Sequence, residues 1–148
     1  MDLAKSHEES YLDLEMVGNR LRGSSLLLLG QSQLAEQCLK DSAAAYSYEK
    51  HKSLDALYGQ DIKVATLTYL GLNQWHQGKI SEIKSCGDEA FELAQKIGSA
   101  NTIGISHFVG RVLPLALLDE TEAVLAASDK TIEVAIALET PLWKVGGL

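Results

Sequence analysis

Two glycines, Gly30 and Gly78, occupy equivalent places in two copies of one pattern, and this repetition restricts the fold more than any other feature. In each copy another glycine, Gly23 or Gly71, stands seven positions before the turn glycine, and an amphipathic run follows. Glycine ends helices because it adopts the left-handed backbone without strain, so each copy predicts a helical hairpin. Such hairpins cannot bury their apolar faces alone and therefore stack. The sequence thus predicts an all-α fold in which antiparallel helical hairpins form a short right-handed α-solenoid.

Hydrophobic periodicity divides the chain, which we interpret as a single domain, into three hairpins over residues 8–48, 62–98 and 101–140. A linker over residues 49–61 separates the first two, with Gly59 as a stop signal and Asp61 as the N-cap of the next helix. Pro114 predicts a kink in the fifth helix, expected over residues 101–117, because proline has no amide to donate. A further helix begins at residues 141–148. The prediction is therefore about six helices plus a C-terminal stub.

Composition excludes several classes of partner. The formal net charge of −7 argues against a nucleic-acid backbone as ligand. The longest apolar runs are far shorter than the roughly 20 residues that cross a bilayer, so no membrane contact is expected. No secretory signal follows Met1, which favours a cytoplasmic location. The remaining class is a protein or peptide partner, and the acidic balance favours a basic or neutral segment.

Catalytic and cofactor motifs are not apparent in the sequence. The segment from Gly71 to Lys79 resembles a phosphate loop, but its glycines are too far apart and Ile80 stands where Ser or Thr binds magnesium. The four histidines are scattered without metal-ligand spacing. We therefore expect no enzyme activity, no catalytic residues, no cofactor and no metal.

Aromatic residues supply the candidate interaction sites. Tyr46, Tyr48 and Tyr58 surround His51 in and beside the linker. Their side chains either wedge the linker against the hairpins, which we favour, or form a polar aromatic rim that contacts a ligand or peptide. Trp143 is expected to be exposed and is a further candidate. By its helical spacing with Gly71, Trp75 is instead expected in the core.

The pattern of small residues, turn glycine and later alanine resembles the tetratricopeptide (TPR) family. The second copy matches best, with Leu70-Gly71, Gly78, Ile83 and Ala90, while the third has Leu118 at the turn. A narrower resemblance connects the chain with the C-terminal repeat regions of bacterial signalling proteins that carry class III adenylate or guanylate cyclase and AAA-type ATPase domains. It rests on His51-x6-Tyr58-Gly59-Gln60-Asp61, Tyr69-Leu70-Gly71, Trp75-x2-Gly78 and Pro141-Leu142-Trp143. It implies a regulatory repeat module, without cyclase activity in this chain.

Three functional hypotheses follow from the sequence. The first is a non-catalytic interaction module whose concave side, lined by the first helix of each hairpin, binds a protein or peptide. The second is a structural unit or fragment of a larger multidomain protein that forms a homodimer or larger oligomer through its C-terminal helices, because the sixth helix lacks a cover. The third is a small-molecule sensor with its pocket near the tyrosine-rich linker.

Overall fold

The protein is all-helical over the part that the structure, a computed structural model, describes: the backbone of residues 3–148, and the side chains from Tyr11 onward except that of Leu12. The all-α prediction is therefore confirmed. Every regular element in this range is a helix, and the elements follow in this order: α1 (Leu3–Leu28), α2 (Ser32–Ala45), α3 (Tyr48–His51), the 3-10 turn η1 (Lys52–Leu54), α4 (Asp55–Tyr58), α5 (Ile62–His76), α6 (Ile80–Ile97), α7 (Ala100–His107), the π-helical segment η2 (Phe108–Val112), α8 (Leu113–Leu117), α9 (Thr121–Ala137) and α10 (Pro141–Gly147).

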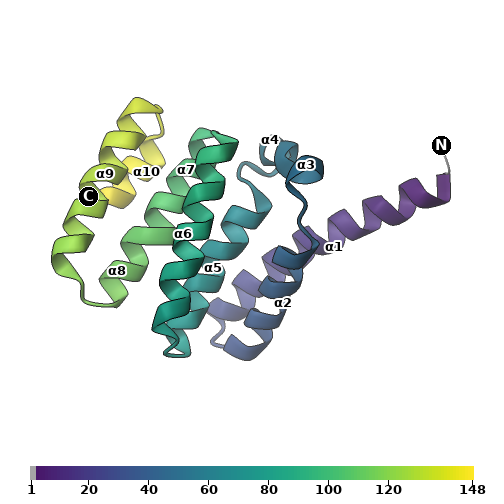
Figure 1. Ribbon diagram of the computed structural model, residues 1–148, viewed down its shortest axis with the longest axis horizontal. Helices are drawn as coiled ribbons and strands as arrows, with labels where there is room; N and C mark the ends of the chain where they lie inside the picture. The colour runs from purple at the N-terminus through teal and green to yellow at the C-terminus, as the bar shows by residue number, and fades with distance from the viewer. Residues whose placement is uncertain (1–2) are drawn as a thin grey trace.

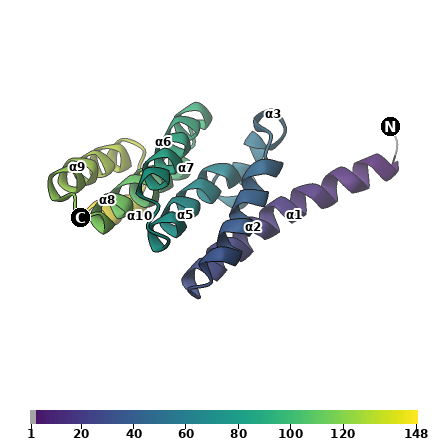
Figure 2. The same cartoon turned by 60° about the horizontal axis from the view of Figure 1, so that its bottom comes forward.

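The long helices lie in two layers (Figures 1 and 2). One layer contains α2, α6 and α9, and the other contains α1, α5, the helix formed by α7, η2 and α8, and α10. Within the second layer α1 contacts α5, and α5 contacts α7. Because consecutive first helices touch, their outer faces form one continuous surface of the molecule.

The turn glycines have the predicted left-handed backbone. Gly30 has φ of 75° and Gly78 has φ of 70°, and each ends a helix whose last carbonyls accept hydrogen bonds from the turn. In the third turn the left-handed residue is Asp119, with φ of 59°, one position after the Leu118 that the sequence pattern indicated. The amide of Glu120 then donates to the carbonyl of Leu115 at 3.1 Å, which is the bond that a Schellman turn requires.

Two boundaries differ from the sequence prediction. The first helix begins at Leu3 rather than near residue 8, and the second ends at Ala45 rather than near residue 48. It ends there because Tyr46 and Ser47 are extended, which directs the chain away from α2. The linker then folds into the short helical segments α3, η1 and α4.

The predicted kink near Pro114 takes the form of the π-helical segment η2, which begins before the proline. Pro114 cannot donate to the carbonyl of Gly110. That carbonyl oxygen lies beside Gly87 of α6, where any Cβ atom would collide with it. The glycine at position 87 therefore allows the irregular part of the fifth helix to pack directly on α6.

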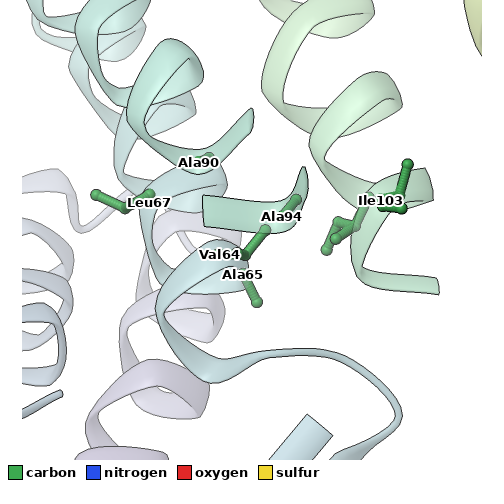
Figure 3. Close-up of a cluster of buried hydrophobic side chains, with 7 residues drawn as sticks. Val64, Ala65, Leu67, Ala90, Ala94 and Ile103 are labelled. Atoms are coloured by element: carbon green, nitrogen blue, oxygen red, sulfur yellow. The ribbon is translucent and has the colours of Figure 1, made fainter. Parts of the chain in front are cut away.

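Small side chains bring the central helices together. A buried cluster joins α5, α6 and α7, and Figure 3 shows most of its members: Val64, Ala65, Leu67, Ala90, Ala94, Ile103 and Ile105. At the other side of α5, Ile62 packs with Met16 and Val17 of α1. Gly23 is also packed closely, since a Cβ there would come within 2.6 Å of the Leu39 side chain of α2. The first of these contacts holds α1 beside α5, and the second holds α1 beside α2.

Candidate interaction site

The tyrosine-rich linker is tied to the helices by a cluster of polar bonds, which we call the connection cluster: Asp13, Tyr46, His51, Asp61 and Thr102. The Tyr46 hydroxyl donates to Asp61 Oδ2 at 2.7 Å, and the Asp61 amide donates to Thr102 Oγ1 at 2.9 Å. The other carboxylate oxygen of Asp61 accepts from the Val64 amide at 2.9 Å, so Asp61 is the N-cap that the sequence predicted. Through its side chain and its backbone amide, the buried residue Asp61 thus joins Tyr46 at the end of α2, α5 and α7.

His51 is almost fully buried, with 3% of its surface exposed. Its Nδ1 accepts from the Ser47 amide at 2.8 Å, so in this arrangement the ring proton lies on Nε2 and is donated to Asp13 Oδ1 at 3.1 Å. Lys50 Nζ donates to the same Asp13 oxygen at 2.7 Å. Burial alone would raise the pKa of Asp13, but the hydrogen bonds from Lys50 and His51 outweigh it and lower the pKa.

The buried carboxyl of Asp61 behaves in the opposite way. Burial raises its pKa above the ordinary value, and burial together with the bond to Asp61 raises the pKa of Tyr46. The Tyr46 and His51 rings also contact each other, with centroids 5.4 Å apart. Tyr46 and His51 therefore make the contacts expected of side chains that wedge the linker against the helical hairpins.

The other two linker tyrosines lie apart from this pair. The Tyr48 ring is covered by the ammonium of Lys96, 3.6 Å from its centroid, which attaches α3 to the end of α6. Tyr58 lies on the surface. The structure therefore separates the candidate residues into a buried pair, one ring stacked under a lysine and one surface ring.

Trp143 is not the exposed anchor that the sequence suggested. Its ring fills the space beside Gly104, where any Cβ atom would collide with the indole. Its Nε1 donates to Asn101 Oδ1 at 2.6 Å, so the side chain fastens α10 to α7. The prediction of an exposed side chain is wrong because α10 folds back against α7 and α9.

An apolar groove lies on the layer of first helices, and we call it the first-helix groove. Its volume is about 440 Å³. Its lining residues come from α1 and the turn that follows it, from α5 and from α8, and none comes from the second helix of a hairpin. They are Leu27, Leu28, Gly30, Leu72, Trp75, His76, Leu113 and Leu117. Leu28 is 84% exposed, and Trp75 and Leu117 are also exposed. Large apolar side chains are thus exposed to solvent within a groove.

The prediction that Trp75 lies in the core is also wrong. Trp75 is 37% exposed. Its Nε1 donates to the carbonyl of Leu117 at 3.1 Å. Because α8 ends at Leu117, no further turn of α8 covers the ring. The bond holds the indole in a fixed position at the rim of the first-helix groove.

A carboxylate clasp lies close to the same end of the molecule. Glu36 of α2 accepts from Gln74 at 3.1 Å, Gln77 at 2.8 Å and Lys79 at 3.1 Å, all at the turn between α5 and α6. Lys40 also pairs with it at 2.6 Å. The hydrogen bond from Lys40, followed by those from the glutamines, strongly lowers the pKa of Glu36. The clasp fixes the turn beside Trp75 to the first hairpin.

A second groove, of about 490 Å³, lies between α6, α8 and α9. It has an apolar floor that includes Gly87, Gly110 and Pro114. Its cations each have an acidic partner: Lys84 with Glu120 at 2.8 Å, Arg111 with Asp88 at 3.4 Å and Lys130 with Glu133 at 2.9 Å. Because those charges are already paired, the first-helix groove is the stronger candidate site.

Sequence reasoning did not identify the groove residues of α8 or the Glu36 clasp. Leu113 and Leu117 belong to a helix that is apolar on more than one face, a pattern typical of a helix buried between neighbours. That excess of apolar residues was the available signal for a groove. No sequence signal pointed to Glu36, because its hydrogen-bond partners lie in and beside the turn of the next hairpin.

No three His, Cys, Asp or Glu side chains gather as metal ligands among the side chains described. Between residues 3 and 148, no helix combines the length and hydropathy needed to cross a membrane. No family model, curated protein or solved structure matches the chain.

Proposed function

We propose that the protein is a non-catalytic interaction module of the TPR type, a short right-handed α-solenoid that binds a protein or peptide in its first-helix groove. The observation that carries this proposal is the groove itself, since it is apolar, open and lined only by first helices. The surface of first helices is where stacked helical hairpins hold extended or helical ligands.

The groove chemistry specifies the ligand. Apart from His76, the described lining residues carry no ionisable side chain. A rigid indole and several leucines suit an apolar anchor, such as a leucine or aromatic side chain of a peptide. The net charge of −7 disfavours an acidic peptide at long range, so a neutral or basic segment with an apolar anchor fits best.

Short random peptides displayed on phage test this proposal directly. Selection on the wild-type protein should enrich neutral or basic peptides with apolar anchors. Leu117→Lys places a charge in the groove and should weaken their binding at least about tenfold. The matched control is Leu57→Lys, which changes an equally apolar but exposed side chain of α4. Peptides that bind both variants equally well, or no enrichment at all, would contradict a binding groove.

The wider setting that we propose is a cytoplasmic regulatory module of a bacterial signalling protein related to nucleotide cyclases. It is supported by the sequence resemblance, whose motif includes Gly59 and Asp61. The genes adjacent to this coding region test it, since neighbouring cyclase or ATPase domains are expected.

A second candidate function is self-association through the C-terminal helices. It is favoured by exposed apolar side chains on α9 and α10: Leu125, Ile136, Leu142 and Val145. A second copy of the chain could cover them. Val145→Lys should then convert a dimer to a monomer in sedimentation velocity, and a dimer that survives this change would exclude the C-terminal surface.

A further inference from the structure

The outer face of α1 carries a stripe of residues at alternating steps of three and four. We call it the α1 stripe: Tyr11, Leu14, Gly18, Leu21, Ser25 and Leu28. All six are exposed, and Tyr11, Leu14 and Leu21 expose 67%, 61% and 50% of their surfaces. Alternating steps of three and four are the spacing of the contact seam of a coiled coil. The opposite face of α1, with Met16 and Val17, is the one buried against α5.

The place of α1 makes this stripe accessible. Its N-terminal half extends away from the other helices (Figure 1). An isolated helix of that length is only marginally stable in water, since tertiary packing supplies most helical stability in proteins. A cover for the stripe would therefore stabilise the projecting half as well as bury its apolar side chains.

The sizes of the stripe residues fit a second copy in the antiparallel direction. Aligned antiparallel, Tyr11 lies opposite the partner's Leu28, Leu14 opposite the partner's Ser25 and Gly18 opposite the partner's Leu21. Small residues then face large ones in each of the inner layers, which lets the helices approach closely. A parallel pair would instead place Gly18 opposite glycine and Leu21 opposite leucine, so that gaps alternate with crowded layers.

The charges beside the stripe favour the same direction. Glu15 and Arg22 are seven residues apart, on one flank of the stripe, and both are exposed. In the antiparallel pair each Glu15 lies near the partner's Arg22, and the two-fold symmetry makes this contact twice. In a parallel pair the two charges would be separated by about 10 Å along the axis, from a rise of 1.5 Å per residue.

We propose that α1 is a self-association helix through which a second copy of this chain binds, antiparallel, along the α1 stripe. This interface is distinct from the C-terminal surface, and it shares a single residue, Leu28 at the end of the stripe, with the first-helix groove. It joins two modules at their N-terminal ends, so the peptide sites of a dimer are presented as a pair. Two linked sites would raise the avidity for a ligand with two anchors.

Sedimentation velocity over a range of concentrations tests the interface. Wild type should reach the mass of two chains, and Leu14→Lys with Leu21→Lys should weaken the dimer at least about a hundredfold, because four lysines then enter the apolar seam. Leu57→Lys, at an exposed position of α4 outside both candidate surfaces, is the matched control and should leave the dimer intact. A wild type that is monomeric at every concentration, or a dimer that only Val145→Lys disrupts, overturns the proposal.

A charge-reversal cycle tests the direction and does not depend on any change in the seam. Glu15→Arg and Arg22→Glu should each raise the dissociation constant about tenfold, because each puts two like-charge pairs across the interface. The double reversal should restore it to within about threefold. Single reversals without effect, or a double reversal as weak as the single ones, would contradict the antiparallel pair. Circular dichroism of each variant checks that its helices are retained.

Discussion

The connection cluster and the first-helix groove differ in how their side chains are used. In the connection cluster, polar side chains of the linker are buried and bonded to one another, as between Tyr46 and Asp61. In the groove, apolar side chains are exposed and uncovered, as at Leu28 and Leu117. Residues whose hydrogen bonds are already made inside the protein hold the linker in place, while the uncovered apolar surface is available to a partner. We therefore propose the first helices, rather than the tyrosine-rich linker, as the place where a partner binds.

The largest expected effect on stability comes from removing the centre of the connection cluster. Asp61→Ala loses the N-cap of α5 and the acceptor of the Tyr46 hydroxyl, which together cost about 2 kcal/mol. The melting temperature should fall by about 6 °C. Asp129→Ala, at an exposed position of α9, is the matched control and should melt within about 1 °C of wild type. Equal melting of the two variants would mean that the cluster does not hold the linker.

The groove end of the molecule should be the more sensitive to acid. The pKa of Glu36 is lowered in the folded state, so its contribution to stability is present above the ordinary value of 4.5 and is lost as the pH falls below it. In the connection cluster the pKa of Asp13 is also lowered, so Asp13 contributes a loss of the same sign, whereas burial raises the pKa of Asp61, which contributes no such loss.

Glu36→Gln should therefore reduce stability by about 1.5 kcal/mol near neutral pH, and this difference should shrink progressively below pH 4.5. Thermal melts across the acid range measure it. Glu92→Gln, an exposed position of α6, controls for the loss of one charge. If the Glu36 difference does not depend on pH, the charged clasp is not what fixes the turn.

A smaller loss of stability should distinguish the buried Tyr46 from the surface residue Tyr58. Tyr46→Phe removes the hydroxyl that donates to Asp61 and should cost about 1 kcal/mol. Tyr58→Phe changes a surface ring and should cost less than about 0.3 kcal/mol. Chemical denaturation resolves this difference. Equal losses would show that burial does not distinguish the two rings.

The smallest effect on stability is expected in the groove. Leu117→Lys places a charge where water already reaches, so the free energy of unfolding should change by no more than about 0.5 kcal/mol. Its effect on peptide binding should nevertheless be at least tenfold, as proposed above. A variant that loses both stability and binding would indicate that Leu117 belongs to the core.

The helices and their turns could be predicted well from the sequence, because they depend on local patterns. Gly30, Gly78 and Asp61 all have the backbone or capping role expected of them. The positions of Trp75 and Trp143 could not, because each depends on a segment more than 40 residues away: Leu117 for the first and Asn101 for the second. The π-helical segment was anticipated only as a kink, since its position depends on the contact between Gly87 and Gly110.

The emission of Trp75 tests the role of the first-helix groove most directly. The chain has two tryptophans, so Trp143→Phe leaves Trp75 as the single reporter. Without ligand its emission should be quenched readily by acrylamide, because the ring is exposed at the groove rim. When a peptide from the display selection saturates the protein, the emission should shift to shorter wavelength and the quenching constant should fall by about half. A peptide that binds tightly while the emission and quenching of Trp75 stay unchanged would place the binding site elsewhere and contradict the proposed function.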